Sequence, residues 1–149
     1  MKLFILTSRV PFPLDKGDKL RIYHQMKSLA EKHELYLCAL QLTFSKDTEE
    51  ARLELESFCK EVHFVKLSIL QVLCSLLLAC FSKTPFQTAL FTSATAKEKV
   101  SKLIHTINPN HIYCQLTRAA EYVRFEDYSK TLDYMDVFSK GMERRADKV

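Results

Sequence analysis

Charged residues gather in one short segment near the start of the chain, directly before an amphipathic stretch. The candidate ligand-binding residues of this segment are Lys16, Gly17, Asp18, Lys19 and Arg21. If the stretch is a helix, its first turn has unpaired backbone N–H groups and the positive end of the helix dipole, which favour a phosphate or a carboxylate. The segment therefore predicts an anion-binding loop. The alternative is that Asp18 only caps the helix and that the lysines are solvated.

Three charged residues later in the chain follow apolar runs and are candidates for the same site. Asp133 and Asp136 lie at and just beyond the end of one run, and Arg118 follows another. A guanidinium group can hold a phosphate or a carboxylate with two parallel hydrogen bonds, although Arg118 can equally pair with Glu121. The two aspartates can also cap a helix that begins near Ser139.

The elements expected around the first segment are a strand, a helix and a second strand. Residues 2–6 form a short apolar run without helical spacing, which is typical of a strand buried on both faces of a parallel sheet. From Leu20 onward apolar residues recur every three or four positions, as on one face of a helix. Residues 35–40 return to strand. Gly17 is one of only two glycines, so we expect the turn to require its conformational freedom.

A strand–helix–strand unit pairs its two strands in parallel. Strands and helices continue to alternate along the rest of the chain. We expect helices over residues 47–60, 95–107 and 118–123, and strands over 62–67, 112–116 and 131–134. In the helix over residues 47–60, Leu53, Leu55 and Phe58 are the expected apolar contacts. The predicted fold class is α/β, a Rossmann-like open and mostly parallel sheet with helices on both faces. Ligands of these sheets bind beyond the carboxyl ends of the strands, where all of the candidate residues fall.

Four segments together resemble a known family. PFPLDKGDKLRIYH, at residues 11–24, resembles the amino-terminal signature of GT-B glycosyltransferases of the large retaining group called family 4. Within that group it is most similar to bacterial sugar transferases of exopolysaccharide and surface-glycan synthesis. The later segments occur in the same order as in those enzymes: TPFQTALF at residues 84–91, CQLTRAAEYV at 114–123 and LDYMDVFS at 132–139.

The resemblance implies an enzyme with two Rossmann-like domains, one facing the acceptor and one holding a nucleotide-sugar donor. A chain of 149 residues has room for one such domain, so we expect residues 1–149 to be the acceptor-side domain, incomplete at its carboxyl end and without the donor-binding domain. It would then be inactive alone. In the family, the loop that carries Asp133 and Asp136 lies beside the acceptor hydroxyl, so the resemblance makes both candidate catalytic residues.

The implied partners are a glycan or lipid-linked acceptor and the missing donor-binding domain. The resemblance implies no cofactor and no catalytic metal, and the nucleotide-sugar is a substrate of the complete enzyme. The five histidines also lack metal-ligand spacing. A net charge of +4, from 22 basic and 18 acidic residues, is too small to indicate a nucleic-acid partner.

Cysteine usage and a long apolar segment bear on location. Five cysteines without a C-x-x-C pair suggest free, buried thiols in the reducing cytoplasm. The apolar segment from Ser68 to Phe81 is shorter than the roughly 20 residues that span a bilayer. It suggests either a helix buried between domains or a helix lying on an anionic membrane at the inner face of the cell membrane. Apolar surface left uncovered by the missing domain would favour a homodimer.

A second function class remains open from the sequence. The chain can also be a non-enzymatic, flavodoxin-like module that binds phosphate or another protein. A receiver-type module places an aspartate at the end of its third strand, and residues 62–68 contain none.

Overall fold

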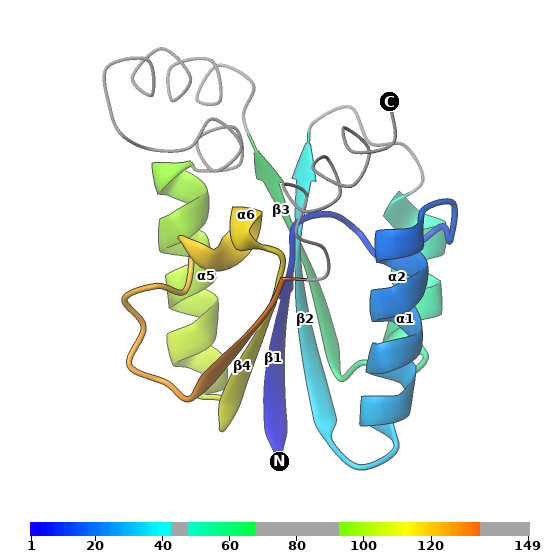
Figure 1. The fold of residues 1–149 in the computed structure, drawn as a ribbon, viewed down its shortest axis with the longest axis horizontal. Helices are drawn as coiled ribbons and strands as arrows, with labels where there is room; N and C mark the ends of the chain where they lie inside the picture. The colour runs from blue at the N-terminus through cyan, green and yellow to red at the C-terminus, as the bar shows by residue number, and fades with distance from the viewer. Residues whose placement is uncertain (43–47, 68–92, 135–149) are drawn as a thin grey trace, which may run out of the picture.

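A five-stranded parallel sheet forms the centre of the molecule. The computed structural model describes residues 1–42, 48–67 and 93–134 (Figure 1). The strands lie in the order β3-β2-β1-β4-β5, and every neighbouring pair is parallel. Their bounds are Lys2–Thr7 for β1, Glu34–Leu42 for β2, Glu61–Leu67 for β3, His111–Gln115 for β4 and Lys130–Asp133 for β5. The predicted Rossmann-like open sheet is confirmed.

Helices cover both faces of this sheet. In Figure 1, α1 and α2 lie on one face and α5 and α6 lie on the other. Side chains alternate along β1, so Leu3 and Ile5 belong to the core on the α1 side, and Phe4 and Leu6 belong to the core on the α5 side. The helix bounds are Gly17–Ala30 for α1, Thr48–Glu56 for α2, Ala94–Ile107 for α5 and Thr117–Ala120 for α6.

The strand order separates two interpretations of the sequence. A flavodoxin-like sheet has the order 2-1-3-4-5, whereas this sheet has the Rossmann order 3-2-1-4-5. The chain leaves β3 and returns to β4 on the other side of β1, so the connections on the two sides of the β1–β4 pair cover opposite faces (Figure 1). The flavodoxin strand order is therefore wrong for the described sheet, whereas a non-enzymatic binding module stays a prediction. The topological switch point lies between β1 and β4.

Helix α5 follows the sequence prediction closely. Ser93 caps its start by accepting a hydrogen bond from the Ala96 backbone N–H at 3.4 Å. Val100 and Ile104 are fully buried, as their spacing predicts. The helix ends at Asn108, whose φ of 48° is the left-handed conformation that asparagine tolerates at a helix end.

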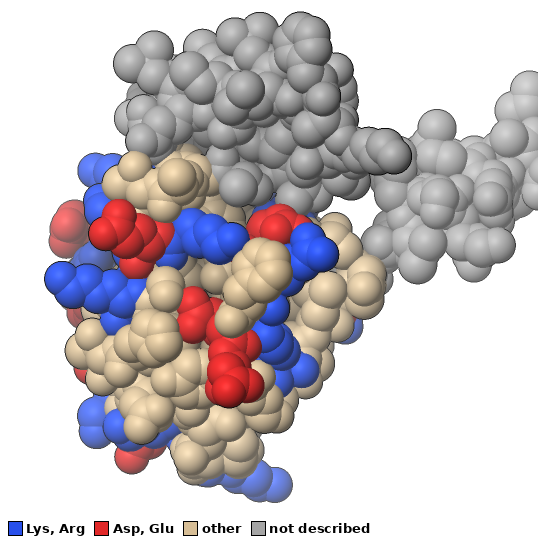
Figure 2. All heavy atoms as spheres, turned by 90° about the vertical axis from the view of Figure 1, so that its left-hand side faces the viewer, with Lys and Arg blue, Asp and Glu red and all other residues tan. Residues whose placement is uncertain are grey.

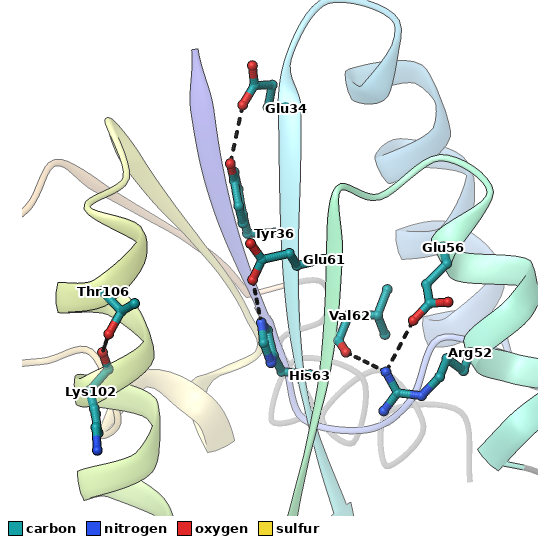
Figure 3. Close-up of polar contacts among 9 residues, drawn as sticks. All are labelled: Glu34, Tyr36, Arg52, Glu56, Glu61, Val62, His63, Lys102 and Thr106. Carbon is teal, nitrogen blue, oxygen red and sulfur yellow. Dashed lines mark hydrogen bonds and ion pairs between the residues drawn. The ribbon is translucent and has the colours of Figure 1, made fainter.

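Helix α2 differs from the sequence prediction in which of its leucines is buried. Leu53 is 71% exposed, so its predicted packing contact is wrong, whereas Leu55 and Ala51 are fully buried. The helical period explains the difference, because residues 51 and 55 share a face and residue 53 points about 180° away from their midpoint. The α2 residue Arg52 contacts the sheet edge: it donates to the Val62 carbonyl at 2.8 Å and pairs with Glu56 at 3.2 Å (Figure 3).

This difference within one helix gives a direct stability test. Leu55→Ala leaves a cavity in the core on the α1 side and should lower the free energy of unfolding by about 2–4 kcal/mol. Leu53→Ala deletes the same atoms from a side chain that is exposed to solvent, so the free energy of unfolding should change by less than about 0.5 kcal/mol. Urea unfolding of both variants beside the parent chain measures the two changes. Equal losses would contradict the observed orientation of α2.

Candidate anion-binding site

The first turn of α1 sits at the carboxyl edge of the sheet, as the anion-binding prediction requires. The N-cap residue is Lys16, whose backbone is extended and whose side chain makes no capping hydrogen bond. The Lys16 carbonyl accepts the first helical hydrogen bond, from the Leu20 N–H at 2.9 Å. Asp18 is therefore inside the first turn and is not the cap, so the capping alternative is wrong. An acidic side chain at this position is stabilised by the helix dipole.

The backbone conformation of Gly17 does not require a glycine. Its φ is not positive, and a Cβ built on it would meet nothing within 4 Å. The turn itself therefore does not need glycine, and that expectation is wrong. The residue leaves open space beside the start of α1.

Asp18 forms an ion pair with an arginine just beyond the end of β1. Its carboxylate pairs with the Arg9 Nε at 3.4 Å, and its backbone carbonyl accepts a hydrogen bond from the Gln115 Nε2 at 3.0 Å. Burial lowers the pKa of the Arg118 guanidinium, the positive charge of Arg9 lowers it further, and Asp18 opposes the shift. The charges of Arg9 and Asp18 thus both act on the Arg118 guanidinium. The predicted alternative partner of Arg118, Glu121, pairs instead with Arg124 at 3.1 Å.

Two hydroxyl groups at the end of β1 are buried without a hydrogen-bond partner. Thr7 is fully buried and Ser8 is 2% exposed, and neither hydroxyl oxygen has a partner in the structure. Alternation along β1 places Thr7 on the face of Leu3 and Ile5, which is the face where α1 starts. A buried hydroxyl without a partner costs on the order of 1–3 kcal/mol. Thr7 and Ser8 are consecutive residues at the carboxyl end of β1, so their buried hydroxyls are candidates for hydrogen bonds to a ligand.

The backbone opposite them is strained. Leu116, directly after β4, has φ 68° and ψ 146°, a conformation that residues with a Cβ rarely adopt. Its N–H donates to the Asp133 carbonyl at 2.8 Å, which holds the turn in place. This turn carries the chain from Gln115 to Arg118. Strain of this kind is maintained where a side chain has to be aimed into a site.

The two remaining predicted lysines differ in surroundings. Lys19 forms an ion pair with Asp15 at 2.7 Å, four residues earlier, and its side chain is largely buried. Lys16 is exposed at the mouth of the loop. Lys19 is thus neutralised locally, whereas Arg9, Arg118 and Lys16 supply the positive charge of the site.

Asp133 is held by two donors from other elements. The Arg21 guanidinium pairs with it at 3.0 Å, and the Tyr113 hydroxyl donates to it at 2.6 Å. Arg21 lies one turn after Asp18, so the carboxyl end of β5 does meet the start of α1. Beside these residues runs a groove of about 590 Å³ whose lining includes Arg21, His24 and Tyr113. Asp136, like the segment from Ser68 to Phe81, lies outside the described residues.

Sequence reasoning missed several residues of this site. Thr7, Ser8 and Arg9 come directly after a predicted strand, and Gln115 and Tyr113 lie within one. Their types are common in any loop or strand, so composition gave no signal. Their place in the chain could have identified them, because loops that directly follow central parallel strands lie at the ligand crevice.

A second basic groove, at the outer edge of β3, is a weaker candidate. It has a volume of about 530 Å³ and includes Arg52, His63, Lys99 and Lys102 in its lining. Arg52 is occupied by Glu56 and the Val62 carbonyl, and His63 contacts Glu61 at 2.9 Å (Figure 3). On the face that α5 covers, acidic and basic side chains are interleaved (Figure 2). Two of the four basic residues of this groove, Arg52 and His63, are therefore already in contact with a carboxylate.

The described residues contain no cluster of three His, Cys, Asp or Glu side chains that could hold a metal ion. Within the same ranges, Cys38, Cys59 and Cys114 are free and buried, as predicted, and burial raises the pKa of each thiol to about 12. No helix there is long and apolar enough to cross a bilayer. No protein-family model matches the chain, and no curated protein matches it significantly.

The Tyr113–Asp133 contact predicts a pH effect. Burial raises the pKa of the Tyr113 hydroxyl far above its usual value of about 10, and the hydrogen bond to Asp133 and the charge of Asp133 raise it further. Above about pH 10 the unfolded chain releases this proton first, so the contribution of Tyr113 to stability is complete below that pH and is lost as the pH rises.

In Tyr113→Phe, the free energy of unfolding should therefore fall less steeply above about pH 10 than in the parent chain. Urea unfolding over a series of alkaline pH values measures the slopes. Tyr134→Phe, at a tyrosine that is 60% exposed, is the matched control and should keep the parent slope. Identical slopes for all three proteins would show that Tyr113 is not protected from ionisation.

Proposed function

We propose that this chain is the acceptor-side domain of a GT-B glycosyltransferase of the retaining family 4 type. In the complete enzyme it would bind a glycan or lipid-linked acceptor while a second domain supplies a nucleotide-sugar. The observation that supports this most is spatial. Three of the four resembling segments fall on the β1–α1 loop, on the turn after β4 and on the end of β5, which meet at one edge of the sheet. The fourth, residues 84–91, lies outside the described residues.

The contacts suggest a division of labour among these segments. Asp133, fixed by Arg21 and Tyr113, would orient the acceptor hydroxyl by accepting a hydrogen bond from it. The Arg9–Asp18–Arg118 cluster would hold a charged group of the ligand at the switch point. The donor phosphate would be held by the second domain, and catalysis would come mainly from positioning and electrostatics.

The chain of residues 1–149 by itself should be inactive in sugar transfer. Incubated with radiolabelled nucleotide-sugars and bacterial membranes as acceptors, it should transfer no sugar above a heat-killed control, because the donor phosphate has no binding domain. Scintillation counting of the lipid and polymer fractions measures this. Turnover by the chain alone would contradict the two-domain proposal.

The complementary result concerns the coding sequence beyond Val149. We expect the open reading frame to continue into a second α/β domain that carries two glutamates separated by seven residues. The product of that frame should transfer sugar, and Asp133→Asn should lower kcat by about ten-fold or more, because the acceptor hydroxyl loses a positioned carboxylate.

Asp127→Asn is the matched control for this variant. Asp127 is exposed in the loop before β5, so the same change in charge should leave kcat unaltered. If both variants have parent kinetics, Asp133 does not orient the acceptor. If the complete reading frame product has no transfer activity on any nucleotide-sugar, the proposed function is wrong.

A further inference from the structure

A groove of about 590 Å³ lies between α1 and β4, on the face of the sheet that α1 covers. On this face β1 carries Leu3 and Ile5, which are buried in the core. In the part of the chain that the structure describes, β4 contributes only Tyr113 to the same core, and Tyr113 is partly buried. Its neighbour Ile112, on the opposite face, is fully buried. The α1 side of β4 is therefore partly open, and the groove follows this opening.

Tyr113 belongs to a hydrogen-bonded network at one end of the groove. Its hydroxyl donates to Asp133 at 2.6 Å, and the Gln25 amide lies 3.4 Å from the same hydroxyl oxygen. The Arg21 guanidinium pairs with Asp133 at 3.0 Å, so a carboxylate matches its positive charge. The network therefore fixes the Tyr113 side chain and compensates the charge of Arg21.

Helix α1 forms the wall of the groove. Arg21, Gln25 and Ser28 line it at intervals of four and three residues, so they lie along one side of the helix over a length of about 10 Å. His24 lines the same groove, and both His24 and Ser28 are exposed. An amide, a hydroxyl and a neutral imidazole each offer both a donor and an acceptor. The groove therefore presents both kinds of group beside an aromatic ring.

These groups fit one class of ligand better than the others. A phosphate requires donors and a net positive charge, and a metal ion requires several acceptor atoms at one point. A wholly apolar ligand would leave the amide and the hydroxyl unpaired. A sugar fits, because each of its hydroxyl groups both donates and accepts and its C–H face can pack against an aromatic ring. The volume of about 590 Å³ is also within the range of about 300–1,000 Å³ that small-molecule sites have.

We infer that the groove between α1 and β4 binds a neutral saccharide, with a sugar ring against Tyr113 and its hydroxyl groups hydrogen-bonded to Gln25 and Ser28. The groove begins beside Asp133 and runs along α1. Within the proposed function, on which this part of the inference rests, it holds the portion of a glycan acceptor that precedes the reacting sugar. The acceptor next to the reacting hydroxyl is then a glycan and not a lipid. Saccharide binding itself does not depend on this role.

Titration of the ¹⁵N-labelled chain with three neutral disaccharides, maltose, lactose and N,N′-diacetylchitobiose, tests the site. At least one of them should bind with a Kd on the order of 1 mM or lower. The largest changes in amide resonance should fall at Gln25, Ser28 and Tyr113. Uridine, a neutral nucleoside with a ring of similar size, should bind more weakly than the best disaccharide.

Ser28→Tyr is the decisive variant, because it fills the groove from an exposed position without removing anything from the core. The thermal midpoint should stay near that of the parent, and the Kd for the best disaccharide should rise by about ten-fold or more, because the new ring occupies the place of the sugar. Ser57→Tyr is the matched control. Ser57 is an exposed serine just after α2, so the same change there should leave Kd within about two-fold.

Two variants at Tyr113 separate the ring from its hydroxyl. Tyr113→Leu removes the aromatic face and should raise Kd by about five-fold or more, whereas Tyr113→Phe keeps the face and should raise it less. Tyr128→Leu is the control for loss of a ring, since Tyr128 lies beside His105 of α5, and it should keep the parent Kd. If a Tyr113 variant fails to fold, Ser28→Tyr still decides the question.

Failure of this inference and failure of the proposed function give different results. Disaccharide binding by the chain, with no sugar transfer by the complete reading frame product, would leave the saccharide site established and would refute only the glycosyltransferase function. In an active product, Ser28→Tyr should raise the acceptor KM by about ten-fold and leave the nucleotide-sugar KM within about two-fold. An unchanged acceptor KM would refute the groove and leave the function standing.

Three results with the chain of residues 1–149 would overturn the inference. The first is that none of the three disaccharides binds. The second is that uridine binds more tightly than all of them. The third is that Ser28→Tyr and Ser57→Tyr have the same Kd.

Discussion

The pairing of β1 on both of its edges is the constraint on which the site depends. β1 is joined in parallel to β2 over Lys2–Thr7 and to β4 over Leu3–Leu6, and both of its faces are covered. A strand held on four sides cannot shift its register to bring a polar side chain to solvent. Thr7 and Ser8 are therefore kept buried without hydrogen bonds, at a cost that packing elsewhere must offset. The same pairing places the start of α1 beside the end of β4.

Electrostatics then determines what the edge of the sheet can accept. Burial and the charge of Arg9 both lower the pKa of the Arg118 guanidinium, and Asp18 opposes this shift. Asp18 lies in the first turn of α1, and its carboxylate pairs with Arg9. The strained turn at Leu116 precedes α6, and Gln115 links this turn to the first turn of α1. The strained turn and these charged side chains thus lie at the same end of the sheet.

Local patterns in the sequence were enough for the fold and for part of the site. The spacing of apolar residues and the positions of glycine and proline predicted the strands and helices, because the buried face of each element repeats with the period of its secondary structure. They failed where the answer depended on contacts between distant segments. The partner of Asp18 is Arg9, a residue on the far side of two prolines. Arg21 and Tyr113 meet Asp133 only because β4 and β5 pair next to α1.

The most direct measurement of the central claim is the location of bound anion on the protein. Backbone amide resonances of the ¹⁵N-labelled chain can be followed while inorganic pyrophosphate is added. The site described above predicts the largest shifts at Ser8 and Arg9, at Gly17 and Asp18, and at Arg118. Largest shifts at Lys99 and Lys102, in the groove beside β3, would contradict it, as would a spectrum that does not change.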